Sequence, residues 1–328
     1  MESLVFAFGV VAPIVAMAAI GYFIKKAGMV DKNFAKTANK VVFKVFLPAM
    51  LFLNVYKIEN IKSVDMGYVF YALGTTFIIF LAALVLSGFV TKDGAKRGAL
   101  IQGIFRSNYA LIGIPLAGSL FGEEGTITAA VLSAFAIPFF NVLAVIVLSV
   151  FGSRKEKIKP AKIAADIIKN PLILGVAAGF AVLAVREIFS GAGIAFRLAD
   201  IAPVMKVLEY LSSAATPVAL IVLGAEFEFS AIAEMKKEII FGTVMRSLAV
   251  PVLALGTAYF IFGDEFSGAQ FAALTALFTT PVAVSSVPMA QEMGGDAALA
   301  GQLVVWTTVA SGITVFIASF IFKAVGIF

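Results

Sequence analysis

The fold of this chain depends on the stretch GAKRGALIQGIFRSNYALIGIPLAGSLFG at residues 94–122. The stretch is long enough to cross a bilayer as a helix, for which about 20 residues suffice. Its middle nevertheless carries Arg106, Ser107 and Asn108. Polar side chains are costly at bilayer depth, where irregular backbone survives only against protein or a water-filled cavity. We therefore predict a broken membrane helix whose break is a ligand site.

The overall composition is that of a protein embedded in the lipid bilayer. Of its 328 residues, 61% are hydrophobic and 14% are charged, whereas soluble domains are about half apolar and a quarter charged. The chain has neither Cys nor His, which excludes disulfides, a thiol nucleophile, zinc or haem held by imidazole, and a histidine proton relay. We expect an all-α polytopic membrane protein that is not an enzyme and holds no metal and no cofactor.

Apolar runs bounded by charged residues and glycines predict ten membrane spans. Basic residues gather in the loops after the odd-numbered spans, above all in the loop at residues 152–163. By the positive-inside rule these loops are cytoplasmic, which puts both termini on the extracytoplasmic side of the cell (inner) membrane. Topology thus explains the basic residues, and no nucleic-acid partner is expected. The predicted spans are residues 4–24, 36–56, 66–90, 95–121, 126–151, 164–186, 203–225, 238–262, 268–291 and 298–322.

The two halves of the chain repeat each other. At one constant offset, Phe105 and Pro115 of the fourth span align with Phe278 and Pro288 of the ninth. Because each half holds an odd number of spans, the second half enters the membrane upside down relative to the first, which is the inverted-repeat plan of many secondary transporters. The predicted repeats are residues 1–151 and 164–328, joined by the cytoplasmic loop at 152–163.

A second alignment supports the repeat. In the first span Gly21 lies eight residues after Pro13, and in the sixth span Gly179 lies eight residues after Pro171. Matches in consistent order are harder to attribute to chance than a single match between apolar segments.

The ninth span, AALTALFTTPVAVSSVPMAQEMGG, is also interrupted near its middle. Pro281 has no N–H and its ring clashes with the preceding turn, so carbonyls one turn back lose their partners and something polar must satisfy them. Two interrupted helices at equivalent places of inverted repeats can cross near the midplane, where half-helix N-termini attract a carboxylate. We assign helix-breaking or structural roles in these and the related spans to Gly113, Pro115, Pro288, Pro48 and Pro217.

Arg106 and Arg246 are the charged residues clearly inside the predicted spans. A guanidinium offers a carboxylate a rigid bidentate fork and stays charged at any relevant pH. We expect Arg106 to contact substrate, with capping of broken-helix carbonyls or snorkelling as the alternative, and we expect a structural role for Arg246. Asn54 and Asn141 are interpreted as interhelical hydrogen-bonding groups.

The sequence resembles the auxin efflux carrier family, which includes plant auxin carriers and bacterial malate and malonate permeases. The resemblance covers nearly the whole membrane region and is carried by SNYALIGIPLAGSLFG in span four, LSSAATPVALIVLGAEF in span seven and TPVAVSSVPMAQEMGGD in span nine. It implies broken crossing helices four and nine. It also implies a scaffold domain of spans 1, 2, 6 and 7, through which a homodimer commonly forms, and a mobile transport domain of spans 3–5 and 8–10.

Residue by residue, the resemblance puts the family's crossover asparagine on Asn108 and its span-nine Leu-Pro on Thr280 and Pro281. Plant carriers have proline where this chain has Ser107, and an aliphatic residue where it has Arg106. The added cation favours a smaller and more highly charged anion than auxin.

We therefore predict a secondary transporter of a small organic anion, a dicarboxylate such as malate or malonate, working by elevator-type alternating access. Its residual charge would be balanced by H+ or Na+ as a coupling ion. The alternatives are an auxin-like aromatic monocarboxylate exporter and, from another class, a membrane receptor or sensor that binds the anion without moving it. The residues expected to bind substrate are Arg106, Ser107, Asn108, Tyr109, Thr280, Pro281, Val282 and Ser285.

Overall fold

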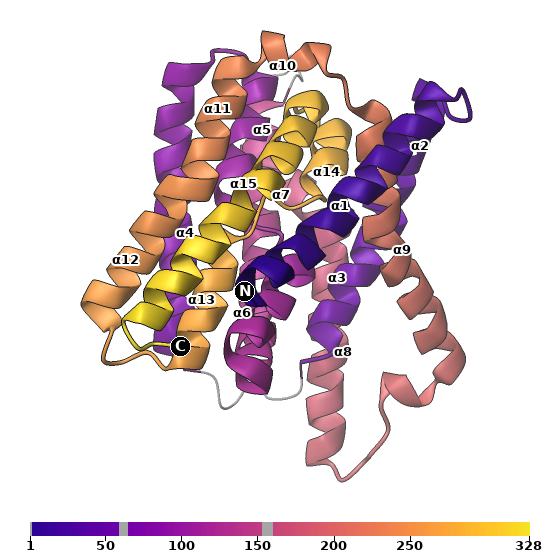
Figure 1. Ribbon diagram of the computed structural model, residues 1–328. Helices are drawn as coiled ribbons and strands as arrows, with labels where there is room; N and C mark the ends of the chain where they lie inside the picture. The colour runs from indigo at the N-terminus through magenta and orange to yellow at the C-terminus, as the bar shows by residue number, and fades with distance from the viewer. Residues whose placement is uncertain (1, 59–64, 153–159) are drawn as a thin grey trace.

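The computed structural model describes residues 2–58, 65–152 and 160–328, and within these residues every regular element is helical (Figure 1). Most of the predicted loop at 152–163 lies outside the described residues. In chain order the elements are α1 (Glu2–Lys26), α2 (Lys32–Val41), η1 (Val42–Phe46), α3 (Leu47–Tyr56), α4 (Met66–Val90), α5 (Gly94–Phe105), η2 (Tyr109–Gly113), α6 (Ile114–Phe151), α7 (Pro160–Ile168), α8 (Pro171–Gly191), η3 (Leu198–Asp200), α9 (Ala202–Glu226), α10 (Ser230–Glu234), α11 (Lys236–Val244), η4 (Met245–Ala249), α12 (Val250–Phe262), α13 (Gly268–Thr279), α14 (Ser286–Met293) and α15 (Ala297–Ala324).

Among the described residues, seven helical stretches are long and apolar enough to cross a bilayer, which makes this a multi-pass membrane protein. The predicted fourth and ninth spans are not single helices in this set, because α5 and α13 each end after 12 residues. The count of ten spans and their inverted repeat stay predictions. The seven stretches are Lys32–Tyr56, Met66–Val90, Tyr109–Phe151, Pro171–Gly191, Ala202–Glu226, Lys236–Phe262 and Ala297–Ala324.

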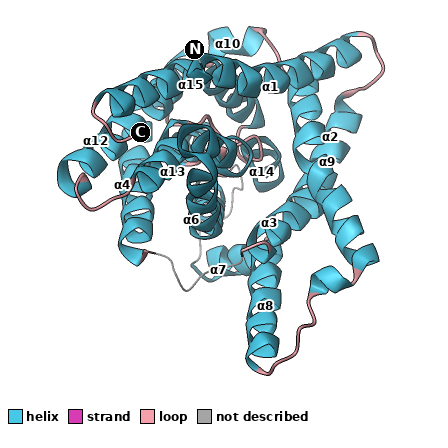
Figure 2. Ribbon diagram, turned by 60° about the horizontal axis from the view of Figure 1, so that its bottom comes forward, coloured by secondary structure: helices cyan, strands magenta, loops and turns pink. Residues whose placement is uncertain are grey.

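The helices pack in two groups, which Figure 2 shows side by side. In the first group α1 and α2 pack against α9, and α3 packs against both α8 and α9. In the second group α13 packs against α6, and α5 packs against α4, α6, α11 and α15. The groups meet where α1 touches α15, where α14 touches α2, η1 and α9, and where α6 touches α8.

The chain folds back on itself inside α6. Phe121 and Gly122 have non-helical backbone angles, and Gly122 has a φ of 62°, which glycine adopts without strain. A Cβ placed on Gly118 would contact Thr126, so the two arms of α6 lie against each other. The kink therefore falls at Phe121 and Gly122, next to the point where the predicted fourth span ends.

Three π-helical turns occur in the described residues, and each ends two residues before a proline. The turns η1, η2 and η4 precede Pro48, Pro115 and Pro251. A proline ring crowds the carbonyl four residues back and offers it no donor, and a π-helical turn adds a residue to that part of the helix. Pro48 and Pro115 are thus accommodated in helices that continue past them, and the prediction that they break their helices was wrong.

The other residues predicted to break helices also lie inside helical segments. Gly113 is the last residue of η2, and Pro217 lies within the uninterrupted α9. Pro288 is in the first turn of α14, where a proline removes no intrahelical hydrogen bond. The non-helical breaks lie at residues 106–108 and 280–285, where polar residues and Pro281 follow the ends of α5 and α13.

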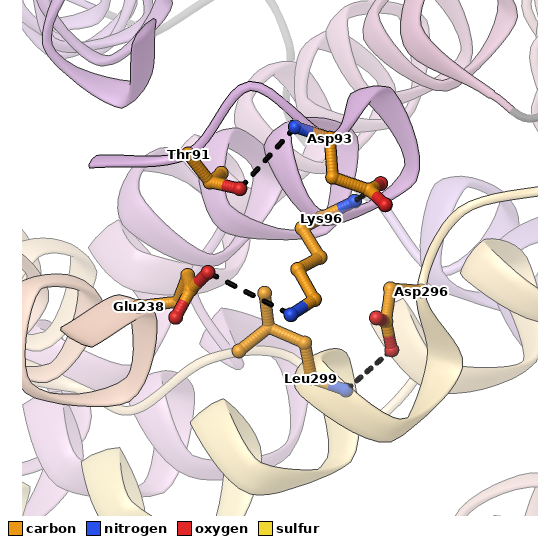
Figure 3. A network of polar contacts seen from close by, with 6 residues as sticks. All are labelled: Thr91, Asp93, Lys96, Glu238, Asp296 and Leu299. Carbon is orange, nitrogen blue, oxygen red and sulfur yellow. Dashed lines mark hydrogen bonds and ion pairs between the residues drawn. The ribbon is translucent and has the colours of Figure 1, made fainter. Parts of the chain in front are cut away.

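A network of polar contacts fixes one end of the second group (Figure 3). Asp93 caps α5 by accepting the Lys96 N–H at 3.1 Å, and Asp296 caps α15 by accepting the Leu299 N–H at 2.8 Å. The Lys96 ammonium lies 3.8 Å from a carboxylate oxygen of Glu238 on α11. The Lys96–Glu238 ion pair joins α5 to α11, and the Asp296 N–H, which donates to the Ala95 carbonyl at 3.1 Å, joins the start of α15 to α5.

In the first group, α1 and α9 approach each other through glycines. A Cβ on Gly224 would overlap the backbone carbonyl of Ala18, and one on Gly21 would overlap that of Ile221. The contact therefore has no room for a side chain at either glycine.

We expect Gly224→Val to lower the melting temperature of the detergent-solubilised protein, with a loss of about 1–3 kcal/mol, because the valine forces α1 and α9 apart. Thermal unfolding measures this. Gly256→Ala is the matched control, since no atom lies within 4 Å of the Cβ position at Gly256 and alanine is the better helix former. Equal melting temperatures for the two variants would contradict the packing described above.

Candidate functional site

The two interrupted segments cross at their breaks. The extended residues after α5 and α13 lie antiparallel, with the Asn108 N–H donating to the Pro281 carbonyl at 2.8 Å and the Ala283 N–H donating to the Arg106 carbonyl at 3.3 Å. In lipid an unpaired backbone group costs several kcal/mol. These two hydrogen bonds pair part of the freed backbone and fix how the segments cross.

Arg246 satisfies the carbonyls at the ends of both broken helices. Its side chain is 1% exposed, and its guanidinium donates to the carbonyls of Thr280 at 2.7 and 2.9 Å, of Leu277 at 3.0 Å and of Ile104 at 3.4 Å. Leu277 lies one helical turn before Pro281, so its carbonyl is one of those that the proline leaves without a donor. Arg246 thus has the structural role predicted for it.

Arg106 lies in a different environment. Its side chain is 4% exposed, and its guanidinium donates to Oδ1 of Asn141 at 2.7 Å and to Sδ of Met289 at 3.1 Å. No carboxylate of the described residues lies within ion-pair distance of it. A guanidinium has about five N–H donors, so donors and an uncompensated charge remain. The carbonyl capping considered for Arg106 is done by Arg246 instead.

A cavity of about 40 Å³ lies beside Arg106, between the two helix groups. The second group contributes all of its polar lining. The first group contributes apolar side chains, those of Leu47, Met50, Leu51 and Leu172. Ligand pockets usually measure about 300–1,000 Å³, so this space can admit water but is smaller than a usual ligand pocket.

Two of the lining residues have buried polar atoms without a protein partner. Oγ of Ser107 and Nδ2 of Asn108 make no hydrogen bond to any of the described residues. A buried polar group left unpaired costs about 1–3 kcal/mol. With the Arg106 guanidinium they form a set of donors that matches a carboxylate.

Five of the eight predicted substrate-binding residues line this cavity, namely Arg106, Ser107, Asn108, Tyr109 and Ser285. Their role in binding stays a prediction. The hydroxyl of Tyr109 donates to the Ala273 carbonyl at 3.2 Å, so it ties η2 to α13.

The other three predicted residues do not line the cavity. The hydroxyl of Thr280 donates back to the Ala276 carbonyl at 2.8 Å. Pro281 accepts through its carbonyl in the crossing, and the Val282 N–H donates to Oγ1 of Thr307 at 3.1 Å. These residues build the crossing with their backbones.

The sequence reasoning missed two features of the site. One is the apolar wall of the cavity, formed by Leu47, Met50, Leu51 and Leu172, and the other is the hydrogen-bond partner of Arg106. Leu47 and Leu172 each adjoin a proline, but nothing in the sequence says which face of the helix meets the crossing. Asn141 was predicted to bond between helices, and it accepts from Arg106. For Asn54 the same prediction was wrong at Nδ2, which is buried without a partner among the described residues.

We expect Asn141→Leu to lower the melting temperature, with a loss of about 1.5–3 kcal/mol, because it removes the oxygen acceptor of a buried guanidinium. Asn54→Leu is the control and should cost less, since both amide nitrogens are unpaired but Asn141 alone of the two accepts from the buried guanidinium of Arg106. Thermal unfolding in detergent compares the two. A loss of the same size in both variants would mean that the Arg106–Asn141 hydrogen bond contributes nothing of its own.

Comparison with known proteins supports a transport role. The sequence matches the family described as membrane transport protein over residues 6–319. An uncharacterized transporter of Methanothermobacter thermautotrophicus is 23% identical over 312 residues, covering 92% of this chain and 93% of that protein. An uncharacterized transporter of Methanocaldococcus jannaschii is 30% identical over 227 residues, covering 66% of this chain and 67% of that protein.

A third relative, from Rhizobium meliloti, bears the name "Putative malonate transporter" and is 24% identical over 315 residues, covering 85% of this chain and 93% of that protein. The family match extends over nearly the whole chain. The protein is therefore a membrane transporter that belongs to this membrane transport protein family, the auxin efflux carrier family that its fourth and ninth predicted spans resemble.

Proposed function

We propose that this transporter carries a small dicarboxylate of the malonate or malate kind. The observation that carries the proposal is the state of Arg106, a buried guanidinium without a carboxylate partner among the described residues. A buried charge is costly unless it is paired. A carboxylate from a substrate would supply the missing partner.

The surroundings of Arg106 favour a second carboxylate. The unpaired donors of Ser107 and Asn108 are next to it in the chain and line the same cavity. The helical segments that restart after the breaks, at Tyr109 and Ser286, present N-termini, which carry partial positive charge. The name of the Rhizobium meliloti relative agrees with a short dicarboxylate.

We further propose that the chain forms two inverted five-span repeats. Under this repeat the contact of α1 with α9 is equivalent to the contact of α8 with α3. A Cβ on Gly21 would overlap the Ile221 carbonyl, and one on Gly179 would lie 3.0 Å from the Phe52 carbonyl. Gly21 and Gly179, which align in sequence, thus each allow a close approach of two helices, and the repeat makes these two helix contacts equivalent.

The two helix groups correspond to a scaffold and a transport domain. The first group holds spans 1, 2, 6 and 7 of the prediction, and the second holds the remainder. In this proposal the second group slides along the first and carries the crossing across the membrane. A homodimer through the first group and a coupling ion belong to the same proposal.

We expect malonate to raise the melting temperature of the wild-type protein, because a ligand that binds the native state stabilises it. In Arg106→Ala the affinity for malonate should fall at least about tenfold, since a hydrogen bond to a charged group contributes about 1.5–3 kcal/mol. Titrations followed by thermal shift measure both affinities. Ser107→Ala should weaken binding by a smaller factor.

Ser133→Ala is the matched control for Ser107→Ala, because the Ser133 hydroxyl donates to the Ala130 carbonyl at 2.6 Å and does not line the cavity. Counterflow of labelled malonate in proteoliposomes then tests transport of the bound anion. An unchanged malonate affinity in Arg106→Ala would remove Arg106 from the site, and binding without exchange would reject malonate as a transported substrate.

A further inference from the structure

The crossing has a second polar site, in which carbonyl acceptors converge, whereas the proposed anion site is lined by donors. Carbonyl oxygens of Ile104 from α5 and of Leu277 and Thr280 from the end of α13 converge on one point, the guanidinium of Arg246. Helix C-termini carry partial negative charge. In transporters with broken helices, half-helix C-termini and unwound carbonyls coordinate the Na+. This is therefore the place in the crossing whose chemistry suits a monovalent cation.

That place is taken by a side chain. Arg246 is 1% exposed, and four hydrogen bonds of 2.7–3.4 Å occupy the three carbonyls. Among the described residues no carboxylate forms an ion pair with it. Its charge is balanced by the carbonyl dipoles, as that of a bound Na+ would be. Unlike Na+, the guanidinium is covalently attached and stays in place at any salt concentration.

Arg246 is connected to the anion site through the backbone. The carbonyl of Thr280 that it holds directly precedes Pro281, whose own carbonyl accepts from Asn108. Ile104 lies two residues before Arg106. The positions of Arg106 and Asn108 therefore depend on the carbonyls that Arg246 ties together.

We propose that Arg246 is a built-in cation that replaces a bound alkali metal ion at the crossing, so that the crossing keeps its shape without Na+. It acts as a positioning residue for the anion site, and this second part rests on the proposed function. In the wild type, Na+ then has no role at the carbonyls of Ile104, Leu277 and Thr280, whatever it does elsewhere in the molecule.

The first experiment measures melting temperatures of the purified protein at constant ionic strength, with Na+ replaced by choline. The wild type gives the reference difference in melting temperature between the two salts. Arg246→Ala should unfold at a lower temperature in choline and recover part of the loss in Na+ or in millimolar methylguanidinium, because either cation can enter the freed carbonyl cluster. Arg246→Lys keeps the charge with fewer donors and should lie between the two.

The matched control is Arg186→Ala. Arg186 also donates to backbone carbonyls, those of Tyr56 and Ile58, but its side chain is 13% exposed and water can replace it. Neither cation should restore its stability. If Arg246→Ala cannot be purified, Arg246→Lys carries the test, and its melting temperature should rise with Na+ by more than that of the wild type.

Malonate binding separates this inference from the proposed function. If wild-type protein binds malonate, Arg246→Ala should bind it at least about tenfold more weakly in choline than in Na+, a larger ratio than that of the wild type. If malonate does not bind the wild type, the proposed substrate fails while the melting temperatures still decide the role of Arg246. An Arg246→Ala variant that gains no more stability than the wild type from either cation would overturn the inference.

Discussion

The structure depends on one constraint, that polar backbone groups inside a membrane must have partners. Two segments of this chain stop being helical at residues 106–108 and 280–285, which frees carbonyls and N–H groups where lipid offers none. The antiparallel hydrogen bonds between these segments pair some of them. Arg246 pairs three further carbonyls at the ends of α5 and α13, those of Ile104, Leu277 and Thr280. The two breaks are thus stable only because they meet.

The same constraint gives two buried arginines opposite roles. Arg246 has its charge balanced by carbonyls, so nothing is left for a ligand. Arg106 has one amide oxygen and one sulfur atom as partners, and the unpaired donors of Ser107 and Asn108 lie beside it. The crossing is therefore polarised, with a cation held by carbonyls on one side and donors without acceptors on the other. The second side is where we propose that the anion binds.

The sequence was informative wherever a polar residue or a proline contradicts an apolar span. Arg106, Asn108 and Pro281 could be recognised because each is costly in a continuous membrane helix. The helix breaks were misplaced at Pro48 and Pro115 because π-helical turns accommodate a proline, which residue type alone does not reveal. The apolar wall could not be predicted, since its residues resemble every other lipid-compatible residue and only packing decides which of them face the crossing.

The distribution of chemistry between the two helix groups has a consequence for movement. All polar residues that line the cavity come from the second group, whereas the first group presents only apolar side chains such as Leu47 and Leu172. An anion bound to Arg106 would therefore keep all its polar contacts if the second group moved relative to the first. The apolar wall makes no hydrogen bond that such a movement would break. The proposed elevator-type mechanism requires this division. The moving group holds all polar contacts to the anion, and the stationary group presents an apolar surface.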